Sequence, residues 1–136
     1  MIPRMRIGYH SRVPQAQSHR DAVLGLIRDL GRPVSVDEIR DGLRQTGIGT
    51  ATVYRIVNKA VEEGAVAKVE LPGAAARFEP ADLPHHHHFE CDACKRVYDV
   101  PGCAKGVSSL APEGFAVESH EIILRGTCRD CTGVAV

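Results

Sequence analysis

Two Cys-x-x-Cys pairs, Cys91/Cys94 and Cys128/Cys131, carry the most definite chemistry in this chain of 136 residues. A two-residue spacer lets both sulfur atoms of a tight turn face one ion, and two such turns can close a tetrahedron of thiolates around zinc. Because no coordination position then stays open, the spacing predicts a structural zinc site rather than a catalytic one. The alternative is a pair of disulfides or a redox dithiol, but the odd number of cysteines, five, argues against a disulfide framework.

A run of four histidines, His85–His88, precedes the first cysteine pair. An affinity tag is the alternative explanation, but tags are normally terminal and longer. Alternate side chains of an extended segment point to opposite sides, so the run would divide between two metal sites. The two pairs would be His86 with His88, and His85 with His87. Nearby residues that could complete the sites are Glu79 and Asp99 for the first pair, and His120 for the second.

Two residues near these groups have a structural alternative. His120 is in phase with Ile122 and Leu124 of an expected strand, so a buried core histidine and a metal ligand are equally good interpretations. Cys103 shares a helical face with Val107 and Leu110, which favours a small buried side chain over a ligand.

The front half predicts three helices and a two-stranded ribbon. Ser18 is the expected N-cap of a helix that ends near Leu30, and Ser35 to Glu38 reads as the capping box of a second helix that ends near Thr46. A third helix starts near Thr50. Its expected buried face consists of Val53, Ile56, Val57, Ala60 and Val61. Two strands, 66–71 and 77–79, follow, and the whole is the outline of a winged helix-turn-helix.

The opposite face of the third helix could read DNA. Arg55 can bond to guanine, Tyr54 can contact a thymine methyl group, and Lys59 can anchor a phosphate. Arg77, on the ribbon, could touch the backbone beside the groove. Residues 1–65 carry a net charge of +3 and residues 66–136 a net charge of −3. The first half is therefore better suited to bind a polyanion, and the second half to bind cations. The alternative is an ordinary solvated helix face or a protein-interaction module.

The rear half predicts strands at 96–100 and 116–124 with a short helix at 103–110 between them. We therefore expect an α+β protein with a winged-helix domain at 1–79, a hinge at 80–84 and a metal-binding dimerisation domain at 85–136. No apolar stretch approaches the roughly 20 residues of a membrane span, and the N-terminus lacks the apolar run of a secretory signal. A cytoplasmic protein is the expectation.

As a whole, the chain resembles the ferric uptake regulator family of bacterial metal-dependent repressors, from about Ser18 to Cys131. The stretches that carry the resemblance are Ala51-Thr52-Val53-Tyr54-Arg55, the His85–His88 run leading into Cys91-x-x-Cys94, and His120 to Gly126-Thr127-Cys128-x-x-Cys131. The resemblance implies that the protein is a homodimer that binds a palindromic DNA operator and that it is not an enzyme. The metal at the hinge would set the angle between the paired DNA-binding domains.

The resemblance also assigns residues. It places structural Zn²⁺ on Cys91, Cys94, Cys128 and Cys131, a regulatory divalent metal on Glu79, His86, His88 and Asp99, and a third site on His85, His87 and His120. The DNA-binding positions are Ala51, Thr52, Tyr54, Arg55, Asn58 and Lys59.

Three departures from the family pattern bear on the metal. Pro33 stands where iron- and peroxide-sensing members usually have a histidine, so the regulatory site has fewer ligands or recruits His19 or His10. His87 stands where the family often has an aspartate, and a nitrogen-rich set favours Zn²⁺ over Fe²⁺ or Mn²⁺. The acidic ligand of the following helix has no clear match, although Cys103 lies close in sequence.

The expectation is therefore a zinc uptake regulator that controls metal homeostasis, with iron, manganese or peroxide sensing as the alternatives. A zinc-dependent hydrolase and a metal-buffering protein are the rivals from other classes. The hydrolase would need a zinc ion with an open position and a general base, and the chain has no His-Glu-x-x-His motif.

Overall fold

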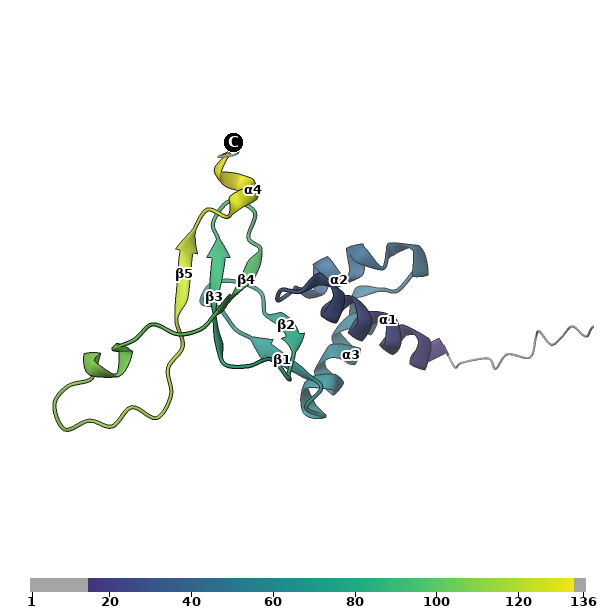
Figure 1. The fold of residues 1–136 in the computed structure, drawn as a ribbon. Coiled ribbons are helices and arrows are strands. Elements are labelled where there is room, and N and C mark those ends of the chain that lie inside the picture. The colour runs from purple at the N-terminus through teal and green to yellow at the C-terminus, as the bar shows by residue number, and fades with distance from the viewer. Residues whose placement is uncertain (1–14, 134–136) are drawn as a thin grey trace, which may run out of the picture.

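The computed structural model describes residues 15–133, which form a three-helix unit with a two-stranded ribbon, followed by a three-stranded sheet (Figure 1). The elements of the first unit are α1 (Gln15–Leu30), α2 (Val36–Gly42), the 3₁₀ helix η1 (Arg44–Thr46), α3 (Thr50–Glu62), β1 (Val66–Val69) and β2 (Arg77–Pro80). β1 and β2 pair in antiparallel register. This order confirms the predicted winged helix-turn-helix outline.

Helix α1 begins earlier than predicted, at Gln15 rather than after Ser18. Gln15 and Ala16 are good helix formers and prolong the helix toward the N-terminus. The capping box of α2 is confirmed: the Glu38 amide donates to Ser35 Oγ at 3.1 Å, and the Ser35 amide donates to Glu38 Oε1 at 3.0 Å. This helix ends at Gly42, sooner than predicted, because the chain then tightens into η1 and stops at Gly47 with a φ of 75°.

The core of the first unit lies between the three helices and the ribbon. Val53, Val57 and Ala60 of α3 are fully buried there, whereas Ile56 and Val61, which were expected on the same face, are only partly buried. Phe78 of β2 closes the core from the ribbon side, where its backbone pairs with Val34. The ribbon is therefore part of the helical core, and its end at Val69 and Arg77 contacts the second unit.

The second unit is a mixed sheet in the order β4-β3-β5. Its elements are β3 (His86–Cys91), β4 (Val97–Pro101), the 3₁₀ helix η2 (Val107–Leu110), β5 (Ile123–Gly126) and the short helix α4 (Arg129–Thr132). β3 lies in the centre, antiparallel to β4 and parallel to β5. The histidine run therefore lies on a strand with a neighbour on each side.

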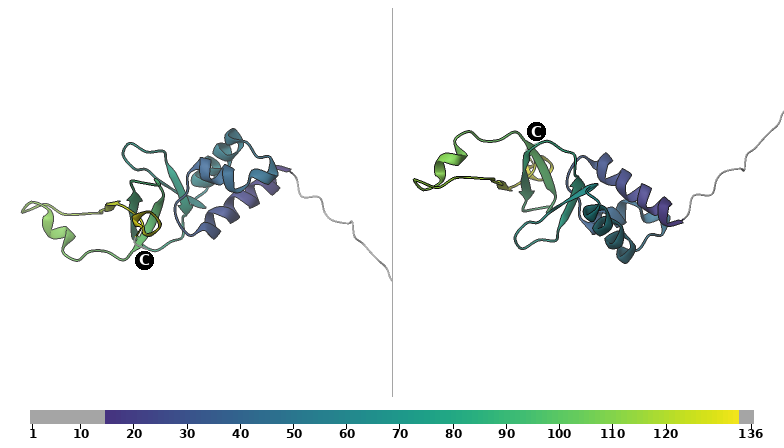
Figure 2. Two further views of the ribbon diagram at one scale, coloured as in Figure 1. Left: turned by 90° about the horizontal axis from the view of Figure 1, so that it is seen from above. Right: turned by 90° about the horizontal axis from the view of Figure 1, so that it is seen from below.

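Two predictions for this half are wrong in extent. The strand expected at 116–124 begins only at Ile123, where the parallel register with β3 starts opposite His88. The helix expected at 103–110 is only the 3₁₀ turn of η2. Residues 102–122 instead form a long excursion away from the sheet, visible in Figures 1 and 2.

The two units contact each other through the ribbon. Val69 and Leu71 pack with Val97 of β4 in a second, small apolar cluster. Arg77 is buried, and its guanidinium donates to the carbonyl oxygens of Ala75 at 2.6 Å and Lys95 at 2.8 Å. The prediction that Arg77 touches a DNA backbone is therefore wrong, since this side chain joins the two units. Within residues 15–133, no helix has the length and apolar character required to cross a membrane.

Candidate metal centres

Three clusters of potential metal ligands lie in or beside the second unit, each with its ligand atoms within 4.8 Å of one another. The clusters are Cys91, Cys94, Cys128 and Cys131; Glu79, His86, His88 and Asp99; and His85, His87, Cys103 and His120. The histidine run divides as predicted, because alternate side chains of β3 point to opposite faces of the sheet. We call the second set the hinge cluster and the third the imidazole cluster.

The four-cysteine cluster is built from two turns. Cys91 ends β3, and the Lys95 amide donates to its carbonyl at 2.9 Å; Cys128 precedes α4, and the Cys131 amide donates to its carbonyl at 3.0 Å. The sulfur atoms of Cys94 and Cys128 lie 3.8 Å apart, far beyond the roughly 2.0 Å of a disulfide bond. All five cysteines are free thiols, so the arrangement does not fit the disulfide alternative.

Backbone amides prepare this cluster for a cation. The amides of Cys94 and Cys128 donate to Cys91 Sγ at 3.5 and 3.3 Å, and these hydrogen bonds lower the pKa of the Cys91 thiol to about 6. The Cys131 thiol shares its surroundings with the other sulfurs, and its hydrogen bond to Cys128 raises its pKa to about 12. Four thiolates cannot ionise together without a positive charge between them, and a tetrahedral zinc ion supplies that charge.

The hinge cluster draws its side chains from both units. Glu79 belongs to β2 of the ribbon, His86 and His88 to β3, and Asp99 to β4, directly opposite His88. His86 Nε2 lies 3.0 Å from Glu79 Oε2 and 3.3 Å from Asp99 Oδ1. His88 Nε2 lies 3.5 Å from Glu79 Oε1 and 3.6 Å from Asp99 Oδ1. Two imidazoles and two carboxylates therefore converge on one point between the units.

Hydrogen bonding in the hinge cluster leaves ligand atoms available. His86 Nδ1 lies 2.7 Å from the carbonyl oxygen of Pro84 and can only donate to it, so in the neutral ring the lone pair is on Nε2, which faces the carboxylates. This is the usual outer support of a metal-binding histidine. Both ring nitrogens of His88 and Oδ1 of Asp99 are buried without a hydrogen-bond partner. Buried polar atoms rarely stay unpaired, and a cation would satisfy them.

The charges of the hinge cluster also call for a cation. Burial, together with the hydrogen bond to Glu79 and its charge, raises the pKa of Asp99 to about 6. Burial works in the same direction on Glu79, but the neighbouring side chains of His88 and Asp99 outweigh it and lower the pKa of that carboxyl group. At neutral pH two carboxylates thus share a nearly closed space. A divalent ion would neutralise both of them, so the donor set fits a metal.

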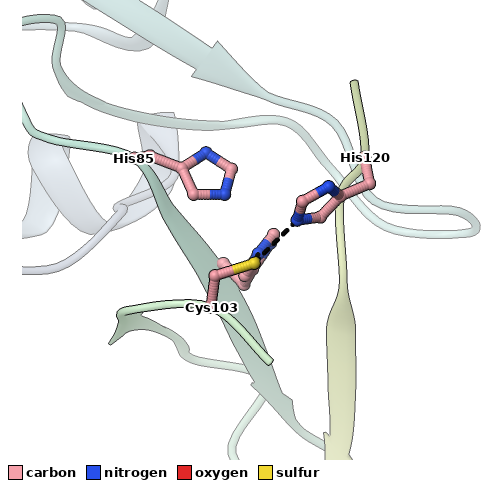
Figure 3. Close-up of side chains that lie close together, drawn as sticks. His85, Cys103 and His120 are labelled. Carbon is pink, nitrogen blue, oxygen red and sulfur yellow. Dashed lines mark hydrogen bonds between the residues drawn. The ribbon is translucent and has the colours of Figure 1, made fainter. Parts of the chain in front are cut away.

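The imidazole cluster lies on the other face of β3. Cys103 Sγ is 2.8 Å from His120 Nε2 and 3.4 Å from His87 Nε2 (Figure 3). The ring centroid of His85 is 4.7 Å from that of His87 and 5.2 Å from that of His120. The expectation of a buried Cys103 on a helix is wrong, because the residue is exposed and precedes η2. The sequence signal for its position was weak: Cys103 lies close in sequence to where the family resemblance expects an acidic ligand. Its actual position depends on how the excursion returns to the sheet.

The replacement for the missing histidine remains a prediction. Pro33 is buried in the core of the first unit and cannot ligate a metal. His19, one of the two suggested substitutes, is not a member of the hinge cluster, and His10 lies outside the described residues.

The predicted DNA-facing side chains lie on one side of α3. Ala51, Tyr54, Arg55, Asn58 and Lys59 are exposed and Thr52 is partly exposed. Tyr54 keeps 49% of its surface, which is unusual for a large aromatic side chain without a partner. Arg55 reaches Thr52 Oγ1 at 3.3 Å, and Lys59 is 3.8 Å from Glu63, so both cations lie at the surface. The face is therefore free to meet a phosphate backbone.

Comparison with known proteins identifies the family. The sequence profile of the ferric uptake regulator family matches residues 15–125. The ferric uptake regulation protein of Campylobacter jejuni is 32% identical over 97 residues, which cover 69% of this chain and 62% of that protein. The protein of the same name from Bordetella parapertussis is 34% identical over 87 residues, which cover 62% of this chain and 63% of that one. The matched region thus spans less than two thirds of either relative.

Solved structures agree on the fold. The Helicobacter pylori ferric uptake regulator superimposes with a TM-score of 0.67 at 22% identity, over 88% of this chain and 83% of that one. The Vibrio cholerae ferric uptake regulator gives a TM-score of 0.66 at 25% identity, over 86% of this chain and 92% of that one. With the family profile matched across both units, this chain belongs to the ferric uptake regulator family.

Proposed function

We propose that this protein is a metal-responsive DNA-binding repressor that works as a homodimer in the cytoplasm and controls zinc homeostasis genes. The observation that carries the proposal is the hinge cluster. Its one ligand from the ribbon, Glu79, directly follows the core residue Phe78, while its other three side chains belong to the second unit. A bound ion would therefore join a DNA-reading unit to the unit that follows it.

The proposed switch is a shift between conformations. Residues 81–85 connect β2 to β3. Without a cation, the negative charges of the buried Glu79 and the partly exposed Asp99 oppose the close approach of the units. With a cation, the same carboxylates favour it. The metal can act only through its higher affinity for the closed arrangement, and DNA that fits this arrangement must in turn tighten metal binding.

The DNA contact would be made by α3, away from the hinge cluster. Arg55 and Tyr54 would meet base edges in the major groove, and Lys59 would meet a phosphate. Two copies would present two such helices, and fixing each one would match half-sites about one helical turn apart on a palindromic operator. Exposed apolar side chains in the second unit, Leu110 and Phe115 among them, support contact between two copies there.

We propose Zn²⁺ as the regulatory ion because the hinge cluster offers four ligands, two nitrogen and two oxygen. Four ligands suit the tetrahedral preference of zinc, whereas Mn²⁺ prefers an octahedral oxygen-rich set. Pro33 supports this choice, since it removes one ligand that a larger coordination number would use. The nitrogen-rich argument drawn from His87 applies instead to the imidazole cluster, because His87 lies on the other face of β3.

The test is a DNA-binding titration against Zn²⁺, Fe²⁺ and Mn²⁺ under anaerobic conditions, using the wild type and the double variant His86→Ala, His88→Ala. We expect Zn²⁺ to tighten operator binding of the wild type, and the variant to remain a folded dimer that no longer responds. If Fe²⁺ or Mn²⁺ tightened operator binding at a lower concentration than Zn²⁺, that ion and not zinc would be the effector. DNA binding that ignores every metal would refute the proposal and favour a metal-buffering protein.

A further inference from the structure

The imidazole cluster contains one residue that the family resemblance does not supply. Three of its members are the predicted histidines, and the fourth is Cys103, whose sulfur lies within hydrogen-bonding distance of two of them. The four side chains come from three separate parts of the chain: the strand β3 and the residue before it, the start of the excursion 102–122, and its end. Convergence from three segments is not explained by local sequence.

We propose that Cys103 is a thiolate ligand that completes a metal site with His85, His87 and His120, and that this site selects a zinc-class ion and ties both ends of the excursion to β3. The inference goes beyond the proposed function, which depends on the hinge cluster, and it stands or falls independently of DNA binding.

The donor atoms define the class of ion. Three imidazoles and one thiolate form a soft, nitrogen- and sulfur-rich set that suits Zn²⁺ or Co²⁺ and disfavours Mn²⁺ or Mg²⁺. The hinge cluster, on the opposite face of the same strand, combines two imidazoles with two carboxylates. One strand thus separates a harder site from a softer one, and the difference rests on Cys103 and on the third imidazole.

Coordination through His87 Nε2 has a structural consequence. The Ile122 amide donates to His87 Nδ1 at 3.0 Å, so in the neutral ring the proton lies on Nε2 and points at the sulfur of Cys103. A metal on Nε2 moves the ring proton to Nδ1 and breaks this bond. The backbone at Ile122, where the excursion rejoins the sheet, must therefore shift when the site fills, and the Ile122 amide reports the event.

The position of the ligands indicates which segment of the chain a bound metal would restrain. Cys103 and His120 stand at the two ends of residues 104–119, which leave the sheet and carry the exposed side chains of Leu110 and Phe115. A metal bridging these ends closes the loop and restricts its conformations, as any cross-link does. Filling the site should therefore slow backbone hydrogen exchange within 104–119.

The test uses Co²⁺ as the probe on the full chain with zinc retained in the four-cysteine cluster. A thiolate bound to Co²⁺ gives a charge-transfer band in the near ultraviolet, which imidazole and carboxylate ligands do not give. We expect the band in the wild type and in His86→Ala, His88→Ala, and its loss in Cys103→Ser and His120→Ala. Cys103→Ser should also weaken Co²⁺ binding at this site by about tenfold or more, since even outer partners of metal ligands have effects of that size. Ser109→Ala, in the same segment, is the matched control and should keep the band.

A second measurement needs no variant. Zn²⁺ added to the wild type should protect Cys103 from alkylation, measured by mass spectrometry, and Mn²⁺ should not. The proposal is overturned if wild-type protein shows no thiolate band, if the band keeps its full intensity in Cys103→Ser while zinc stays in the four-cysteine cluster, or if Zn²⁺ leaves the alkylation rate of Cys103 unchanged.

Discussion

The substitution Glu79→Gln should remove the link that the bound metal makes between the two units, while leaving the fold nearly unchanged. Gln has the same shape as Glu, but it removes the negative charge that β2 contributes to the hinge cluster. Glu79 is only 4% exposed, and its oxygen atoms lie 3.0 and 3.2 Å from His86 Nε2. Among residues 15–133, no other carboxylate of the first unit belongs to the cluster, so Glu79 is the ligand in this range through which the ion would reach the ribbon.

The size of the effect follows from charge and linkage. Two opposite unit charges 4 Å apart attract by about 4 kcal/mol at an effective dielectric constant of 20. A divalent ion doubles this attraction, which sets an upper bound on the contribution of the Glu79 charge. Desolvation offsets much of it, and a loss of about 100-fold in zinc affinity, about 2.7 kcal/mol, is a conservative expectation. At a zinc concentration of about 1,000 times the wild-type Kd, stabilisation by zinc would fall from about 4.1 to about 1.4 kcal/mol.

The assay is urea unfolding with and without added zinc, with the zinc of the four-cysteine cluster retained in both arms. Without added zinc, Glu79→Gln should be at least as stable as the wild type, because it removes the repulsion between the Glu79 carboxylate and the neighbouring carboxylate of Asp99. Glu121→Gln is the matched control: this carboxylate lies 4.0 Å from His88 Nδ1, but its side chain is 59% exposed. We expect it to change zinc stabilisation by less than about 0.5 kcal/mol. Equal losses in the two variants, or none in Glu79→Gln, would refute the assignment of Glu79 as a ligand.

Three further changes test other parts of the structure. Cys91→Ser should release the structural zinc and unfold the second unit, seen as loss of bound zinc in elemental analysis and loss of protease resistance; a folded, zinc-containing variant would contradict the four-thiolate site. Arg55→Ala should weaken operator binding by about 1–3 kcal/mol in fluorescence anisotropy without altering zinc stabilisation, and unchanged affinity would remove Arg55 from the DNA contact. Ser35→Ala should lower the free energy of unfolding by about 1 kcal/mol through loss of the α2 capping box, measured by urea denaturation, and an unchanged midpoint would mean that the cap contributes nothing.

Local chemistry in the sequence was sufficient for the helical unit. The capping box at Ser35 and the apolar spacing of Val53, Val57 and Ala60 each concern residues within a few positions of one another, and the helices follow them closely. Such signals act through backbone hydrogen bonds and one buried face, so they need no knowledge of distant partners. The exceptions, the early start of α1 and the early end of α2, concerned helix ends, where neighbouring residues of similar propensity compete.

Strand positions in the second unit were less accessible from the sequence. A strand at 116–124 was predicted from its composition, but β5 begins at Ile123 because a strand exists only where another lies beside it. Arg77 illustrates the same limit: its charge suggested a surface role, yet the packing of β1 against β4 buries it and gives its donors to two carbonyls.

Ligand identity came from the sequence, since residue type and the alternation of a strand were enough to divide the histidine run and to pair the cysteines. Membership of Cys103 in the imidazole cluster came only from the tertiary structure. The physical reason is range. Side-chain chemistry and strand periodicity depend only on residues close together in the sequence. The distance between Cys103 and His120 depends instead on the path of the whole segment between them and on the sheet to which both ends return.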